Sequence, residues 1–185
     1  VSNQTGQLVT DALEKAGGSA SNFDQAIRRS SELSAFLEIH IEQGKRLVSE
    51  GISLGIVTSI TGIYREEITV VGEANHAGTT LMNDRKDALT AACELIITLE
   101  ECCLNHPADE VVGTIGKINI KPNAANIIPA EATFTAEIRG KTVIEIEEVL
   151  AVWEREIGRI KSKRNVIIKR RTCLNQKPES MDGHL

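Results

Sequence analysis

Apolar residues recur at steps of three and four along two segments of the chain. The first segment runs from Asp84 to about Glu101, and the second runs from Thr142 to about Ile160. This spacing gives each segment one apolar stripe, which is typical of a helix that lies on a sheet. We expect Asp84 to cap the first helix, and Thr142 and Glu145 to form a capping box at the start of the second.

The segments around these helices have the period-two pattern of strands. The clearest is 132–140, where every second residue is apolar, as in a half-buried antiparallel strand. Further strands are expected at about 64–71, 111–122 and 165–174. In the second of these, one face is expected to carry Val112, Thr114, Gly116, Ile118 and Ile120.

From Tyr64 onward the expected elements follow the order strand, helix, strand, strand, helix, strand. Two helices on one face of a four-stranded antiparallel sheet make an α+β fold of the ferredoxin-like βαββαβ type, with a core of about 110 residues. The other face of the sheet and its edge strands remain available for pairing with another copy of the chain.

The first part of the chain has a weaker pattern. Residues 6–16 and 23–30 fit short helices, and residues 34–44 form a compact apolar run with His40 at its centre. If this run is a strand, the imidazole of His40 lies between two glutamates on one face.

Composition and charge argue against several classes of protein. The 185 residues carry a net charge of −5, and basic residues concentrate only at about 161–171, so no extended basic surface suggests a nucleic-acid partner. Aromatic residues make up 3% of the chain, which predicts an aliphatic core. No apolar run approaches the roughly 20 residues of a membrane span. The cysteines form no C-x-x-C pair, which argues against structural zinc and favours free thiols in a reducing cytoplasm.

Four residues could carry chemistry, and each also has a structural explanation. His76 lies in ANHAGTT, whose small residues either form an ordinary loop or present the imidazole to a ligand. His40 is either a structural histidine or one ligand of a metal that needs further ligands. Asn126 lies between two prolines, which either stiffen the segment and fix its amide in place or simply mark an ordinary turn. Arg139, at a strand end, either pairs with Glu137 or binds a carboxylate through its planar guanidinium.

The order of these residues is more specific than any of them alone. The chain resembles the hydantoinase/carbamoylase family of metal-dependent amidases in the succession of FLEIHIEQG, GIVTSITG, VVGEANHAGTTLMNDRKDAL and GKINIKPNAANIIPAEATFTAEIR. This family includes N-carbamoyl-L-amino acid hydrolases, allantoate amidohydrolases and β-alanine synthases, and it is related to the aminoacylase-type metallopeptidases. The resemblance is most specific between about Phe36 and Arg139.

The resemblance implies an α/β catalytic domain that binds two divalent ions, with Zn or Mn expected, and an inserted lid or dimerisation domain of the α+β type. Residues 1–62 then form the end of a first catalytic segment. Residues 63–174 form the lid, and residues 175–185 begin the returning catalytic segment.

It also implies roles for five residues. His40 corresponds to a metal-binding histidine, and Gln43 near it is a weaker candidate for substrate binding. His76 corresponds to the catalytic lid histidine, which stabilises the developing oxyanion or holds the substrate, usually in the site of the partner subunit. Asn126 and Arg139 correspond to substrate-binding lid residues, with Arg139 taking the carboxylate of the substrate.

The other metal ligands of the family have no counterpart in this chain. The resemblance therefore implies the central part of a cytoplasmic amidohydrolase for N-carbamoyl-L-amino acids or allantoate-type ureido acids. This part is expected to supply the lid and a homodimer interface, to bind no metal by itself and to be inactive alone. Two alternatives stay open at this point: a stand-alone ferredoxin-like module that dimerises or binds an effector without catalysis, and an aminoacylase-like peptidase.

Overall fold

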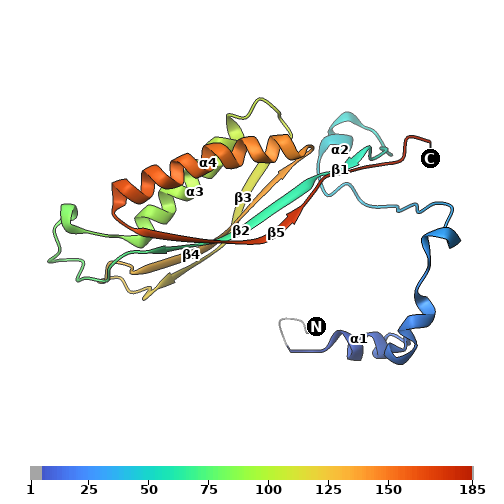
Figure 1. Ribbon diagram of the computed structural model, residues 1–185, viewed down its shortest axis with the longest axis horizontal. Helices are drawn as coiled ribbons and strands as arrows, with labels where there is room; N and C mark the ends of the chain where they lie inside the picture. The colour runs from blue at the N-terminus through green and yellow to red at the C-terminus, as the bar shows by residue number, and fades with distance from the viewer. Residues whose placement is uncertain (1–5, 185) are drawn as a thin grey trace. The chain divides into compact units, whose positions relative to one another are not determined.

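Figure 1 shows the computed structural model of the chain, which describes residues 6–184. The chain divides into two units, one up to Gly55 and one formed by Ile56–His184, and each is described here by itself. Neither the longest helix nor any other helix among the described residues combines the length and the apolar composition that a membrane span needs.

The second unit contains a four-stranded sheet with two helices on one face (Figure 1). All neighbouring strands are antiparallel, in the order β3-β4-β2-β5. This order is the ferredoxin-like one, so the expected α+β fold is confirmed. The elements are β2 (Gly62–Val71), α3 (Ala88–Leu104), β3 (Val112–Lys121), β4 (Glu131–Gly140), α4 (Val143–Arg164) and β5 (Ile167–Gln176). Two short strands, β1 (Ser59–Ile60) and β6 (Glu179–Ser180), pair separately.

The core lies between the helices and the sheet and is almost entirely aliphatic, as the composition predicted. The alternation expected in β4 is confirmed, because its even-numbered residues are buried and its odd-numbered ones are not. The helices bury one stripe each over the same face of the sheet. The largest fully buried apolar side chains are Trp153, Phe134, Ile68, Leu95, Leu99, Ile138, Ile160, Val70 and Val149.

The two long helices begin with different caps. α4 has the expected capping box, in which the Glu145 amide donates to Thr142 Oγ1 at 3.2 Å and the Thr142 amide donates to the Glu145 carboxylate at 3.0 Å. The prediction that Asp84 caps α3 is wrong. Asp84 ends a separate short 3-10 helix, Met82–Asp84, and the chain is extended at Arg85 and Asp87 before α3 begins. Asp87 caps α3 instead, accepting from the amides of Leu89 and Thr90.

The predicted face of β3 is also wrong. A bulge between Ile115 and Lys117 adds one residue to this strand relative to β4. Before the bulge Ile115 lies opposite Ala136, and after it Ile118 lies opposite Phe134, so both are on the helix side. Val112 and Thr114 therefore lie on the other face from Ile118.

The first unit consists of short elements with no buried residue among them. They are α1 (Val9–Lys15), α2 (Arg46–Glu50) and the 3-10 helices Ala20–Ala26 and Ser30–Glu32. Residues 34–44 form no strand, so the strand considered for His40 is wrong. The reason is that nothing in the described unit covers this apolar run, in which Ile39 is 100% exposed.

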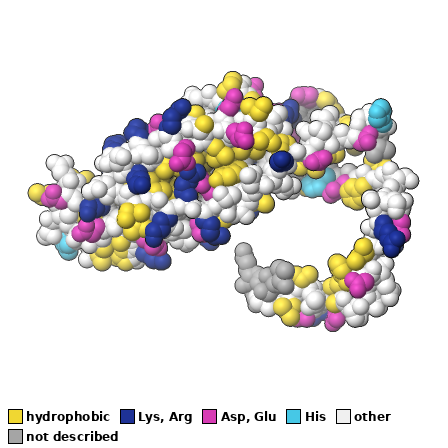
Figure 2. All heavy atoms as spheres, in the orientation of Figure 1, with side chains coloured by type: hydrophobic (Ala, Val, Ile, Leu, Met, Phe, Trp, Pro, Cys, Tyr) yellow, Lys and Arg dark blue, Asp and Glu magenta, His cyan; other side chains and the backbone are white. Residues whose placement is uncertain are grey.

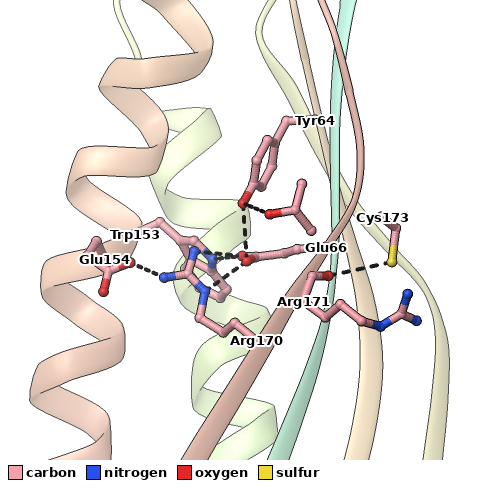
Figure 3. A network of polar contacts seen from close by, with 8 residues as sticks. Tyr64, Glu66, Trp153, Glu154, Arg170, Arg171 and Cys173 are labelled. Atoms are coloured by element: carbon pink, nitrogen blue, oxygen red, sulfur yellow. Dashed lines mark hydrogen bonds and ion pairs between the residues drawn. The ribbon is translucent and has the colours of Figure 1, made fainter.

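A buried polar network joins β2, α4 and β5 (Figure 3). Glu66, which is 1% exposed, accepts hydrogen bonds from Trp153 Nε1 at 2.9 Å and from Arg170 Nε and Nη2 at 2.8 and 3.0 Å. The Tyr64 hydroxyl donates to it at 3.4 Å, and Arg170 also pairs with Glu154. The buried carboxylate is therefore both paired and hydrogen-bonded, as a buried charge requires.

A second ion-pair cluster ties α3 to the end of α4. The Arg164 guanidinium, hydrogen-bonded to Glu94, lowers the pKa of this carboxyl from 4.5 to about 2 against the opposing effect of burial. Lys163 Nζ, 2.9 Å from Glu94 Oε1, also lowers the pKa of Glu94. Because the folded-state pKa lies below the unfolded one, this cluster stabilises the fold fully above about pH 4.5.

We therefore expect Glu94→Gln to lower the free energy of unfolding at pH 7, and expect this loss to shrink as the pH falls from about 4.5 towards about 2. Urea denaturation of both proteins at pH 7, 4 and 2.5 measures the difference. A difference that is the same at all three pH values would contradict the ionic origin of this stabilisation.

Candidate functional site

The loop between β2 and α3 carries His76 and is closed at its base by backbone hydrogen bonds. The Gly72 amide donates to the Ala130 carbonyl at 2.8 Å, and the Glu73 amide donates to the Lys86 carbonyl at 2.9 Å. A Cβ atom on Gly72 would collide with the Lys86 carbonyl oxygen. Only glycine therefore allows the two ends of the loop to approach so closely.

His76 lies at the start of a tight turn and is exposed. Its Nδ1 accepts a hydrogen bond from the Gly78 amide at 3.1 Å. Its carbonyl accepts from the Thr80 amide at 3.2 Å and from the Thr80 hydroxyl at 2.9 Å. Because Nδ1 is an acceptor, the neutral ring carries its proton on Nε2 and can donate it to a ligand.

The structure brings Asn126 next to this turn. His76 and Ile127 form an isolated antiparallel bridge, and the Ala77 amide donates to the Asn126 carbonyl at 2.9 Å. On the other side of the bridge, the Ile128 amide donates to the Asn75 carbonyl at 2.9 Å. Asn126 itself is exposed, so an imidazole and a carboxamide lie on neighbouring residues of two joined loops.

Arg139 lies at the other end of β4, on the sheet face away from the helices. Its Nε contacts Glu137 at 2.7 Å, and Arg65 Nε contacts the same carboxylate at 2.8 Å. Burial opposes the charge of Glu137, but hydrogen bonds from both arginines outweigh it and hold the pKa of this carboxyl below its ordinary value. Arg139 thus pairs with Glu137, as its structural explanation expected, although the Arg139 side chain is still 45% exposed.

Within one chain, Arg139 lies far from His76. The loop that carries His76 begins at the end of β4 where Glu131 lies, because Val71, the last residue of β2, pairs with Glu131. From Glu131 to Arg139 the strand spans roughly 27 Å at the usual rise per residue. A small substrate cannot contact both side chains of the same chain.

In the first unit, His40 and Gln43 lie in exposed, irregular chain. His40 Nδ1 is 2.5 Å from the Ile41 carbonyl oxygen, and Gln43 has a positive φ of 54°. Glu42 accepts from the amides of Arg46 and Leu47, so it caps α2. Within residues 6–184, no group of three or more His, Cys, Asp or Glu side chains could hold a metal ion. The described residues alone do not make a site for two divalent ions.

Sequence reasoning missed two arginines close to these residues. Arg65 shares Glu137 with Arg139, and the alternation of β2, which places it on the open face, could have indicated this. Arg85 donates to backbone carbonyls of the His76 turn, for which the sequence has no signal. On the face drawn in Figure 2, basic and acidic side chains are interspersed over the second unit and form no continuous basic surface.

A family model described as "Peptidase dimerisation domain" matches residues 58–165, so the chain belongs to this family. Two curated relatives indicate the branch. An allantoate amidohydrolase of Bacillus subtilis is 44% identical over 137 residues, which are 74% of this chain and 32% of the relative. An N-carbamoyl-L-amino-acid amidohydrolase of Pseudomonas sp. is 40% identical over 137 residues, again 74% of this chain and 32% of the relative.

A solved structure has a similar fold. A hydantoinase/carbamoylase family amidase from Burkholderia multivorans is 30% identical, with a TM-score of 0.74, and the match covers 78% of this chain and 35% of that one. The resemblance to this family is therefore confirmed. The chain spans about a third of the length of these relatives, in the region of their dimerisation domain.

Proposed function

We propose that this chain is the lid and dimerisation segment of an amidohydrolase that cleaves a C–N bond of N-carbamoyl-L-amino acids or allantoate-type ureido acids. The observation that carries the proposal is the joining of the His76 and Asn126 loops in a chain whose relatives are amidohydrolases of this kind. The boundaries 62/63 and 174/175 between lid and catalytic segments remain part of the proposal.

The proposed roles follow from the chemistry of each side chain. Hydrolysis of a ureido carbonyl builds negative charge on its oxygen, and the Nε2–H of His76 is a donor for that oxygen. The Asn126 carboxamide, on the loop that is joined to the His76 loop, would hold a polar group of the same substrate. Arg139 offers a permanently charged guanidinium to the carboxylate of the substrate, in competition with Glu137.

The separation of about 27 Å along β4 supports a site shared between two chains. His76 and Asn126 of one copy and Arg139 of a second copy would then bind one substrate molecule. The edge strands β3 and β5 each have a backbone side with no partner strand in this sheet, which supports pairing between copies. We propose a homodimer in which each site takes residues from both lids.

The catalytic metals belong to the proposal for the complete enzyme. His40 is the residue of this chain that would contribute one ligand, and Gln43 would lie near that position. Two divalent ions, with Zn or Mn expected, would activate the attacking water. The free cysteines, of which Cys103 has its pKa raised to about 11 by burial, support the proposed cytoplasmic location.

The test uses Arg139→Ala in a complete amidohydrolase that contains this chain, with ammonia release from allantoate and N-carbamoyl-L-amino acids as the assay. We expect KM for carboxylate substrates to rise about 10- to 100-fold, because one charge-assisted contact is lost. Arg65→Ala is the matched control, since it removes the other partner of Glu137 and should change KM less than about threefold. Unchanged KM for every carboxylate substrate would contradict the role of Arg139.

Mixing two variants tests the shared site, with the substrate concentration well below the wild-type KM so that each variant alone has little activity. If each site takes His76 from one chain and Arg139 from the other, a dimer of His76→Ala with Arg139→Ala has one intact site. Equal mixing with free exchange of subunits should then restore about a quarter of the wild-type activity. A mixture as inactive as its components would show that both residues act within one chain.

A further inference from the structure

Arg85 holds the turn that carries His76. Its Nη2 donates to the carbonyl oxygens of Ala77 at 2.7 Å and Thr80 at 3.0 Å, and its Nε donates to the Thr80 oxygen at 3.2 Å. The side chain is half-buried. Such charge-assisted bonds are stronger than neutral ones, and a planar guanidinium satisfies two carbonyls in one fixed geometry. A shorter or uncharged side chain cannot replace all three contacts.

The Ala77 carbonyl belongs to the same peptide group as the N–H that contacts the His76 ring, and the Thr80 carbonyl lies further along the same turn. The Gly78 amide, which donates to His76 Nδ1, lies between Ala77 and Thr80 in the turn. Arg85 thus holds the peptide plane of this donor through the Ala77 oxygen, and the following part of the turn through the Thr80 oxygen. The position of the donor in turn decides which ring nitrogen accepts and which one keeps its proton.

The neighbours of Arg85 have other partners. The Lys86 ammonium contacts the exposed Glu73 carboxylate at 3.2 Å, and Asp87 caps α3. Arg85 is therefore the cation of this segment that contacts the His76 turn itself, as far as residues 6–184 show.

We propose that Arg85 is a positioning residue, which fixes the 77–80 turn so that His76 keeps Nδ1 on the Gly78 amide and presents Nε2–H as a donor. The catalytic consequence rests on the proposed function. A donor that is already oriented stabilises a developing oxyanion without reorganisation of the site, whereas a mobile ring has to be ordered during the reaction.

NMR on the 185-residue chain tests the positioning without any assay of activity. The chain has four histidines, and the spectrum of His76→Gln assigns the ring nitrogens of His76. In Arg85→Met, we expect the Gly78 amide to exchange with solvent about tenfold faster or more, and the ring nitrogens of His76 to lose the shift of a hydrogen-bonded Nδ1. Arg85→Lys should lie between wild type and Arg85→Met, because an ammonium reaches one carbonyl but does not reproduce the fork.

Lys86→Met is the matched control, because it removes a neighbouring cation that does not contact the turn. It should leave both signals unchanged. The proposal would be overturned if Arg85→Met left the signals of Gly78 and His76 as they are in the wild type. If Arg85→Met does not fold, Arg85→Lys carries the same test, since wild-type exchange of Gly78 in that variant would overturn it as well.

Kinetics of the complete amidohydrolase separate this proposal from the proposed function. Arg85→Met should lower kcat about tenfold or more with little change in KM, and Arg85→Lys should recover part of the loss. A loosened turn with unchanged kcat would support Arg85 as the residue that orders the turn, but it would overturn the catalytic role of His76. A fall in kcat without any change in the NMR signals would overturn the positioning role.

Discussion

Replacing His76 with alanine in the complete amidohydrolase is expected to lower kcat by about 10²- to 10³-fold with little change in KM. This is the usual effect of removing one donor that serves an oxyanion. The contact exists mainly in the transition state, so its loss affects kcat and kcat/KM alike. Steady-state ammonia release at several substrate concentrations measures both constants.

Two further variants sharpen the interpretation of His76→Ala. His76→Gln keeps an N–H donor on a side chain of similar length, so it should retain more activity than His76→Ala. His106→Ala is the control histidine, because His106 Nδ1 accepts from the Ala108 amide at 3.1 Å and Nε2 contacts Glu148 at 3.0 Å. It should reduce stability and leave kcat unchanged. A His76→Ala enzyme with wild-type kcat would remove His76 from the mechanism.

Replacing Arg170 with methionine should lower the free energy of unfolding of the chain by about 3–5 kcal/mol, because a buried carboxylate then loses its counter-charge. Glu66 is 1% exposed, and Trp153 and Tyr64 are its other hydrogen-bond donors (Figure 3). Neutral donors do not compensate for a lost charge at such a position. Urea denaturation at pH 7 measures the difference.

The neighbouring residue supplies a matched control for Arg170→Met. Arg171 contacts Glu67 at 3.0 Å on the exposed side of β5, and its side chain is 68% exposed. Arg171→Met should therefore change the free energy of unfolding by less than about 1 kcal/mol. Adding Glu66→Gln to Arg170→Met should recover part of the stability, since the buried charge is removed. Equal effects of Arg170→Met and Arg171→Met would contradict the importance of burial.

Much of the fold follows from local patterns in the sequence. The capping box of Thr142 and Glu145 and the alternation of β4 are properties of short segments, and the structure confirms both. Two local predictions in the second unit failed because distant segments decide them. Asp87 replaces Asp84 as the cap of α3, since Asp84 ends a separate 3-10 helix and hydrogen bonds from Glu73 to Lys86 and from Ala88 to Pro129 hold the chain between the two helices. The bulge after Ile115 reverses the face of β3, and nothing in its apolar pattern marks it.

The candidate site shows the same division. His76, Asn126 and Arg139 were selected from the sequence, and their roles remain predictions. That the loops of His76 and Asn126 join, and that Arg139 lies roughly 27 Å along the strand from them, could not be predicted from local patterns. Arg85 was missed because its partners are backbone carbonyls, which every residue has.

The sequence by itself therefore determined the α+β class, the order of the elements and the family to which the chain belongs. The class and the order of the elements follow because side-chain periodicity decides which face of each helix and strand is buried. The family was indicated by the resemblance of four sequence stretches in their order along the chain. Only the tertiary structure decided which functional residues meet, which aspartate caps α3, and which cation holds the His76 turn. Those contacts are made largely by backbone groups, and where such groups meet depends on how the whole sheet is assembled.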